Sequence, residues 1–220
     1  MSDSLKVAFA QLNPTVGAIG ANCARALAAH GTATEAGADL IVYPELFISG
    51  YPPEDLVLKP AFVEDCMQAL DGLKAATANG APAMLMSLPW ADDGKVYNAV
   101  ALVEDGEVTA VRYKYDLPNY GVFDERRVFA QGPMPGPVNF RGVRIGVPIC
   151  EDIWTEEVTE CLAETGAEIL LVPNGSPYES DKQDVRLNLV VARVTETGLP
   201  LVYLNQVGGQ DELVFDGASF

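Results

Sequence analysis

The pattern of apolar and polar positions in the first half of the chain predicts alternating strands and helices. Strands are expected at residues 5–12, 39–45 and 83–88, and helices at 21–38 and 61–79. This βαβαβ order implies parallel pairing of the strands, because each helix carries the chain back to the edge where the next strand begins. We therefore expect helices to cover a buried sheet.

The second half begins with an antiparallel pattern. Residues 98–103 and 108–113 alternate around a turn at 104–107, which predicts a hairpin. Further strands are expected at residues 143–149, 168–172 and 200–207, with helices at 156–166 and 182–197. Residues 213–220 have an extended pattern but stop without the hairpin partner that the pattern calls for. We expect the last strands to be truncated.

Length and composition predict one domain spanning residues 1–220. A chain of 220 residues with 49% hydrophobic residues can bury one sizeable core and is short for two domains. The Pro- and Gly-rich loop at 132–137 is too short to be a domain linker. The N-terminus lacks a secretory signal pattern, and no apolar run approaches the roughly 18 residues that a membrane span needs. We expect a cytoplasmic protein with no membrane partner.

Charge and cysteine content exclude several classes of function. The chain has 14 Lys and Arg against 31 Asp and Glu, a formal net charge of −17, which repels nucleic-acid phosphates and anionic lipid. Its four cysteines include no C-x-x-C pair, which argues against a zinc site and a disulfide scaffold. We expect free thiols, no metal and no nucleic-acid partner.

Histidine is nearly absent from the chain. The only one, His30, closes the alanine-rich stretch 21–29, where we expect it to face solvent at the end of a helix. Ser-His-Asp catalysis, Cys-His catalysis and His-ligated zinc would each depend on that single side chain. An enzyme with this sequence needs another general base.

Three reactive side chains stand where an apolar strand gives way to loop, which is where α/β folds place their active sites. Glu45 closes a buried strand, Lys114 lies in an aromatic strand, and Cys150 ends a strand that leads toward a helix start. Helix-end N–H groups would favour its thiolate and could hold an oxyanion. Each has a plainer interpretation: a surface or capping carboxylate, a lysine reaching solvent, and an inert buried thiol. The remaining cysteines lie in helical patterns and take the inert interpretation: Cys23, Cys66 and Cys161.

Taken together, the order Glu, Lys, Cys resembles the nitrilase (carbon–nitrogen hydrolase) superfamily over essentially the whole chain. The segments 43–56, 117–125 and 150–152 look more narrowly like the glutaminase domain of glutamine-dependent NAD synthetases. The long segment Leu-Pro-Asn-Tyr-Gly-Val-Phe-Asp-Glu at 117–125 separates that subfamily from other amidases. This resemblance implies an α/β fold, a four-layer αββα sandwich with mixed sheets.

The resemblance also implies a mechanism. Cys150 would attack the side-chain amide of L-glutamine, Glu45 would act as general base, and Lys114 would stabilise the oxyanion. Glutamate and ammonia would form through a cysteine thioester. The residues implied in glutamine binding are Tyr120, Ser176 and Lys182, with Glu125 as a supporting or ammonium-binding carboxylate and Tyr51, Phe123, Glu151 and Trp154 as weaker candidates for the pocket lining.

The family further implies partners beyond glutamine. Its ammonia passes to an ATP-dependent synthetase domain on the same polypeptide, whose Ser-Gly-Gly-x-Asp-Ser loop does not occur in residues 1–220. ATP and Mg²⁺ are expected only in that domain, and no cofactor in the glutaminase domain. Subunits of the family pair, so we expect a homo-oligomer. Two alternatives stay open: a stand-alone amidase or nitrilase acting on small amides, and a non-catalytic interaction module that keeps the fold.

Overall fold

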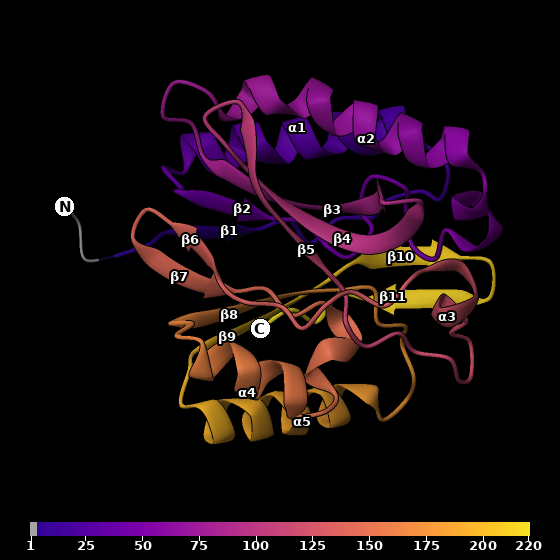
Figure 1. Cartoon of the computed structure of the whole chain (residues 1–220), viewed down its shortest axis with the longest axis vertical. Helices are drawn as coiled ribbons and strands as arrows, with labels where there is room; N and C mark the ends of the chain where they lie inside the picture. Colours follow the sequence, from indigo (N-terminus) through magenta and orange to yellow (C-terminus); the bar gives the residue numbers. More distant parts are fainter. Residues whose placement is uncertain (1–3) are drawn as a thin grey trace.

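The computed structural model describes residues 4–220 and shows two larger β-sheets packed face to face between two layers of helices, together with a separate two-stranded sheet (Figure 1). This is the αββα sandwich with mixed sheets predicted from the sequence. Figure 1 shows α1 and α2 above the first sheet, and α4 and α5 below the second.

The first sheet has the strand order β1-β2-β3-β4-β5. Its first three strands are parallel, as predicted, and β4 and β5 continue it as antiparallel hairpins. Helices α1 (Ile19–Glu35) and α2 (Pro60–Lys74) lie along its outer face. Its strands are β1 (Val7–Phe9), β2 (Leu40–Val42), β3 (Ala83–Asp92), β4 (Lys95–Glu104) and β5 (Glu107–Tyr113).

The second sheet has the strand order β6-β7-β8-β9, in which β6 runs antiparallel to β7 and the others are parallel. Helices α4 (Glu157–Glu164) and α5 (Lys182–Thr197) cover it. Its strands are β6 (Val138–Phe140), β7 (Val143–Gly146), β8 (Ile169–Asn174) and β9 (Leu201–Asn205). The short elements are α3 (Glu125–Val128) and the 3-10 helices Glu54–Leu58, Ala75–Thr77 and Cys150–Ile153.

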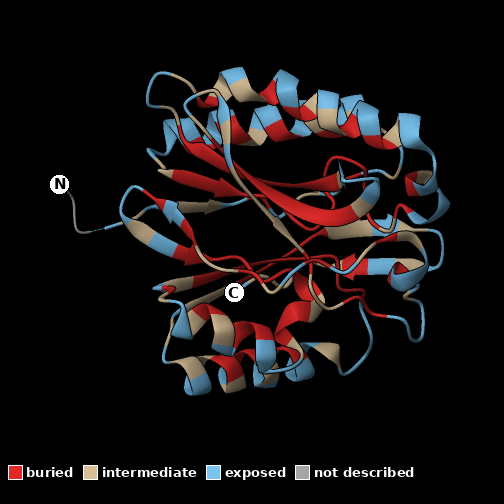
Figure 2. Cartoon of the chain, in the orientation of Figure 1, coloured by how far each residue is buried: buried red, intermediate tan, exposed pale blue. Residues whose placement is uncertain are grey.

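One large apolar cluster lies between the two sheets, and another packs the first sheet against α1 and α2. Val42 and Leu102 of the first sheet and Phe140 and Leu171 of the second belong to one buried cluster. All three residues of β2 are buried, because helices cover one face of the sheet and the second sheet covers the other. Figure 2 shows buried residues along the facing strands and exposed ones on the outer faces of the helices.

The prediction of an unpaired C-terminal strand is wrong. β11 (Leu213–Asp216) pairs antiparallel with β10 (Val207–Gln210), and the two close around a two-residue turn. Asp211 in that turn has φ of 50°, in the left-handed region that such tight hairpin turns require. The partner strand β10 could not be predicted from alternating apolar and polar positions, because Gly208 and Gly209 have no side chains.

The expectation that His30 faces solvent is also wrong. The helix continues to Glu35, and His30 falls on the same buried stripe as Ala26 and Ala33. The side chain is only 5% exposed, and its Nε2 lies 2.8 Å from the carbonyl oxygen of Pro82. That backbone partner offsets the cost of burying the imidazole, so His30 is a structural residue of the core.

Across residues 4–220, the structure contains no helix of the length and apolarity that a bilayer crossing requires.

Candidate active site

Glu45, Lys114 and Cys150 each lie just beyond a strand. Glu45 is in the turn that follows β2, Lys114 directly follows β5, and Cys150 begins the 3-10 helix beyond β7. All three side chains are withdrawn from solvent, with exposures of 0%, 0% and 4%. The strand ends therefore bring a carboxylate, a cation and a thiol into the protein interior.

Lys114 is paired with two carboxylates. Its Nζ lies 2.7 Å from Glu45 Oε1 and 2.8 and 2.9 Å from the two oxygens of Glu125. Burial alone would lower the pKa of Lys114, but the two carboxylates outweigh it and hold that pKa well above its usual range. The side chain is thus a fixed positive charge, and the interpretation of a lysine reaching solvent does not apply.

The Glu45 carboxylate receives donors on both oxygens. Asn98 Nδ2 donates to Oε1 at 2.7 Å, beside Lys114, and the backbone N–H of Gly175 donates to Oε2 at 2.9 Å. Gly175 follows β8 of the other sheet, so this bond joins the two sheets at the site. Donors from three separate segments hold the carboxylate in one orientation.

Cys150 occupies a strained turn. Its φ is 46°, in the left-handed region that side-chain-bearing residues rarely adopt, and such strain is concentrated at functional sites. Burial, followed by the charge of Glu45, raises the pKa of the Cys150 thiol well above its usual range. This rise in pKa is opposite in direction to the favoured thiolate expected from the sequence, and desolvation is its largest cause. The resting group is a thiol, which needs a base to become a nucleophile.

Asp152 ties the turn of Cys150 to the segment after Lys114. Its Oδ2 accepts the N–H of Ile149 at 2.8 Å, and its Oδ1 accepts those of Tyr115 and Asp116 at 3.0 and 2.7 Å. Burial raises the pKa of Asp152 to about 7 although these bonds oppose the rise. The carboxylate fixes the spacing between the segments that carry the thiol and the lysine.

Glu125 begins α3 and joins the same cluster. Besides its two contacts with Lys114, its Oε1 accepts the phenol of Tyr51 at 3.2 Å. Burial raises the pKa of Glu125 to about 7. The structure therefore brings two further sequence candidates, Glu125 and Tyr51, to the ion pair.

Tyr120, Phe123 and Glu151 form a second group. The Tyr120 hydroxyl donates to the Glu151 carboxylate at 2.9 Å, and its ring meets Phe123 edge-on with centroids 5.4 Å apart. Glu151 follows Cys150 directly, and burial raises its pKa. Tyr120 is half-exposed, so this group borders solvent beside the thiol.

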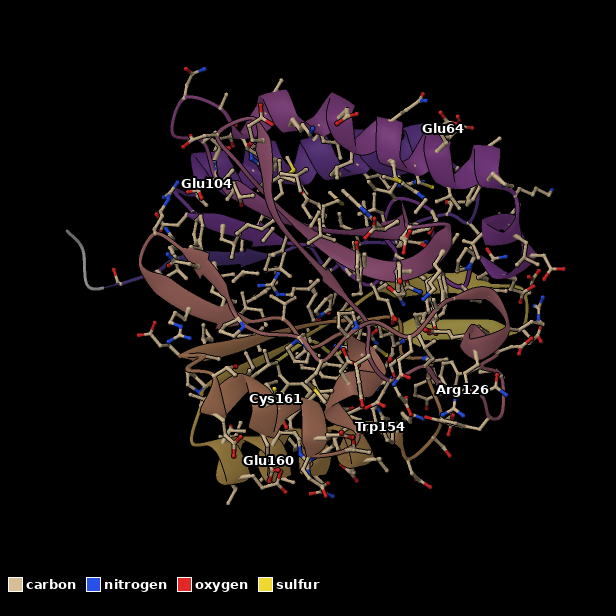
Figure 3. The ribbon with its side chains drawn as sticks, in the orientation of Figure 1. Glu64, Glu104, Arg126, Trp154, Glu160 and Cys161 are labelled. Carbon is tan, nitrogen blue, oxygen red and sulfur yellow. The ribbon has the colours of Figure 1, made fainter. Side chains whose placement is uncertain are left out.

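Ser176 lies in the segment between β8 and α5, and Lys182 is the first residue of α5. Ser176 follows Gly175, is buried, and accepts a bond from Arg186 Nε at 3.1 Å on its hydroxyl. The Lys182 Nζ lies 5.0 Å from the ring centroid of Trp154, a cation–π contact. Trp154 lies in the layer of α4 and α5 (Figure 3), where it packs on the core.

Arg186 is a buried cation that holds this segment. Its guanidinium donates to the carbonyl oxygens of Ser176 and Pro177, each at 2.8 Å. Its charge is balanced by Asp216 of β11, whose oxygens lie 2.8 and 3.0 Å from Nη1. The bonds fix the backbone of the Ser176 segment against the terminal hairpin.

Several residues of the cluster were missed in the sequence. Asn98 is a lone amide in an apolar strand, and Arg186 is one of two arginines on the buried stripe of α5, so each carried a weak signal. Gly175 acts through its backbone N–H, which no side-chain pattern reveals. Across residues 4–220, no group of three or more His, Cys, Asp or Glu side chains is placed to hold a metal ion.

Comparison with known proteins agrees with this arrangement. A family model described as carbon-nitrogen hydrolase matches residues 6–220. The chain is 51% identical over 220 residues to a glutamine-dependent NAD(+) synthetase of Rhodobacter capsulatus and 47% identical over 225 residues to one of Xylella fastidiosa. It spans 40% of the length of each of these two relatives.

Solved structures give the same picture. A glutamine-dependent NAD+ synthetase of Acinetobacter baumannii matches 98% of the chain with a TM-score of 0.93 and 39% identity, and 41% of that protein is covered. An amidase from Nesterenkonia sp. matches 98% with a TM-score of 0.87 and 29% identity, with 81% covered. One solved mutant of it carries the acetamide moiety of fluoroacetamide on its active site cysteine. With its sandwich fold and a family match across almost all of its length, the chain belongs to the carbon–nitrogen hydrolase family.

Proposed function

We propose that the chain is the glutaminase part of a glutamine-dependent NAD synthetase, and that it hydrolyses L-glutamine to glutamate and ammonia. The observation that carries this proposal is 51% identity over all 220 residues to a synthetase of that name, in a chain with a buried glutamate–lysine pair beside a thiol. The absence of any catalytic histidine is no obstacle, because His30 is a core residue and Glu45 can serve as the base.

The first half-reaction begins with proton transfer. Cys150 Sγ gives its proton to Glu45 and attacks the amide carbon of glutamine, which places a negative charge on the amide oxygen. Lys114 stabilises that oxyanion, and the backbone N–H of Glu151 at the start of the 3-10 helix is a second donor. The carbon–nitrogen bond then breaks as Glu45 returns its proton to the nitrogen. Ammonia leaves, and a γ-glutamyl thioester remains on Cys150.

The second half-reaction uses the same carboxylate. Glu45 takes a proton from water, whose oxygen attacks the thioester carbonyl. The carbon–sulfur bond breaks, the thiolate regains the proton, and glutamate leaves. One base therefore serves both steps, which fits a carboxylate held by donors from three separate segments.

In this proposal, glutamine recognition falls to the remaining site candidates from the sequence. Tyr120 and Glu151 supply a hydroxyl and a carboxylate at the solvent border, suited to the α-ammonium group. Ser176 and Lys182 supply a hydroxyl and a cation, suited to the α-carboxylate. The same proposal places four further residues at the glutamine pocket. Tyr51, Phe123 and Trp154 would line it, and Glu125 would contribute its carboxylate.

The proposal extends to the partner of the reaction. The synthetases of Rhodobacter capsulatus and Xylella fastidiosa are longer than this chain, which spans 40% of each, so the ammonia would amidate deamido-NAD on a synthetase domain of the same polypeptide. ATP and Mg²⁺ would act there. A cytoplasmic location is supported by the free cysteines of the described residues. A homo-oligomer is supported by exposed apolar side chains on α5: Val185, Leu187 and Val191.

A small-amide hydrolase is the second candidate. The Nesterenkonia amidase shares the fold, and 81% of its length is covered. Its 29% identity is well below the 51% of the synthetase, which favours the glutaminase. A non-catalytic module would have no reason to keep a lysine and two carboxylates buried together, because buried charges are costly.

The test is covalent labelling with 6-diazo-5-oxonorleucine, a reactive glutamine analogue. We expect one adduct at Cys150, found by peptide mass spectrometry, and none in Cys150→Ala. Cys161 on α4 (Figure 3) and Cys23 are half-buried thiols outside the site and serve as internal controls. Labelling that persists in Cys150→Ala would overturn the proposal. Release of ammonia from acetamide but not from glutamine would favour the small-amide hydrolase.

A further inference from the structure

Asn98 is buried between the two carboxylates of the site. It lies in β4, is 0% exposed, and its Nδ2 is 2.7 Å from Glu45 Oε1 and 3.4 Å from Glu125 Oε2. Its backbone carbonyl oxygen also accepts the backbone N–H of Lys114 at 2.8 Å. One residue therefore contacts the base, its neighbouring carboxylate and the segment that carries the cation.

The other end of the same side-chain amide is left without a partner. Among the described residues, Asn98 Oδ1 is one of a few buried side-chain oxygens that accept no hydrogen bond. A buried oxygen that accepts no hydrogen bond within the protein is destabilising, and an apolar side chain of the same shape would lack it. Within the protein the amide therefore makes its contacts through its N–H group, which lies against both carboxylates.

The contacts of Glu45 indicate what that N–H group does. A carboxylate oxygen has two lone pairs, and Oε1 already accepts both Lys114 Nζ and Asn98 Nδ2. Oε2 accepts only the N–H of Gly175. One lone pair thus remains open on Oε2 and none on Oε1.

We propose that Asn98 is a positioning residue that saturates Glu45 Oε1 and thereby makes Oε2 the oxygen that takes the proton of Cys150. In this step the S–H bond breaks, an O–H bond forms on Oε2, and the products are a thiolate and a neutral carboxylic acid. Without Asn98, Oε1 regains a free lone pair, and the base has two competing sites and one fewer anchor. The inference deepens the proposed function and rests on it for the identity of the base.

The test replaces the amide by an apolar side chain of nearly the same shape. Asn98→Leu removes both the N–H donor and the unpaired oxygen, so we expect a folded protein whose glutaminase kcat falls about 100-fold, the loss typical of a misplaced catalytic group. The ionised carboxylates lose a donor, which disfavours their charged form. The acid limb of the pH–rate profile should therefore move to higher pH. The charged and titratable groups that face Glu45 are Lys114, Glu125, Cys150, Tyr51, Glu151 and Tyr203, and none of them changes in the variant.

Asn22→Leu is the matched control. Asn22 is equally buried, in α1, and its amide bonds the backbone of Thr15 and Ile48. Its loss should lower the melting temperature and leave the acid limb in place. Asn98→Ser, whose hydroxyl is too short to bridge both carboxylates, gives the same test if the leucine variant does not fold.

The readout does not require glutamine. The rate of Cys150 alkylation by iodoacetamide, followed against pH by mass spectrometry, reports the same proton transfer, so a failure of the glutaminase assignment is separable from a failure of this inference. A shifted acid limb in the Asn98 variants and an unshifted one in Asn22→Leu is the expected result. An unchanged acid limb in folded Asn98→Leu would overturn the proposal. Equal shifts of that limb in Asn98→Leu and Asn22→Leu would overturn it too.

Discussion

A glycine joins the two sheets at the site, and an added methyl group there should damage both packing and chemistry. A Cβ built on Gly175 would lie 2.7 Å from Cδ1 and Cγ of the Tyr51 ring and 3.0 Å from its Cε1. The ring cannot retreat easily, because Tyr51 is 3% exposed and its hydroxyl is bonded to Glu125. The Gly175 segment must then move away from Tyr51.

Two effects determine how much stability and activity Gly175→Ala should lose. Overpacking of a filled core costs about 1–3 kcal/mol. Moving the Gly175 N–H away from Glu45 Oε2, now at 2.9 Å, weakens a bond to a charged group of the kind that contributes about 1.5–3 kcal/mol. We therefore expect Gly175→Ala to lower the free energy of unfolding by at least about 1 kcal/mol and to reduce glutaminase kcat by about 100-fold, because the base is displaced.

Urea unfolding and ammonia release measure the two effects. Gly72→Ala is the control, since Gly72 lies in α2 and a Cβ added there would meet no atom within 4 Å, and alanine should stabilise that helix by about 1 kcal/mol. In a Tyr51→Ala background the methyl group has room, so the stability cost of Gly175→Ala should shrink. Wild-type stability and activity in Gly175→Ala would refute the packing described for this site.

Two further predictions concern the charged cluster. Glu45→Gln should remain folded and release little ammonia. Lys114→Met leaves two carboxylates buried without their cation, so it should lose about 3–5 kcal/mol of stability as well as activity. Ammonia release at the wild-type rate in either variant would remove that residue from the mechanism. Burial raises the pKa of Glu125 to about 7 from an ordinary value of about 4.3, so between these values the folded protein retains a proton that the unfolded chain has released. This contribution to stability is complete below about pH 4 and is lost as the pH rises through about 7. Thermal unfolding of wild type, measured against pH relative to Glu125→Gln, should show that loss. Melting temperatures that change in parallel with pH in the two proteins would contradict the prediction.

Most of the order of elements was predictable from the sequence because it rests on local periodicity, although the three-residue strand β6 was missed. α5 begins and ends at the predicted residues, 182 and 197, and Gly198 closes it with φ of 69°. β10 was not predictable, because a strand with two adjacent glycines has no alternation. His30 was misplaced for a related reason: its burial depends on a carbonyl group that lies far along the chain, at Pro82.

The site was predictable as a set of residue types and not as a network. Glu45, Lys114 and Cys150 stand out because each interrupts an apolar strand end, and the structure places Glu45 and Lys114 in contact. The state of Cys150 could not be read from its neighbours in sequence, because the surrounding layers determine its desolvation. The contacts of Asn98 could not be predicted either, because the two carboxylates that it meets lie 53 and 27 residues away in the sequence.

The guanidinium of Arg186 has a consequence for how the molecule opens. It is fully buried, and its charge is balanced by Asp216 on β11 while it holds the backbone of Ser176 and Pro177. Peeling the terminal hairpin away would leave that cation buried and unpaired, so the hairpin cannot fray by itself without also loosening the loop. The amides of β10–β11 and of the Ser176 loop should therefore exchange with solvent deuterium as one cooperative unit.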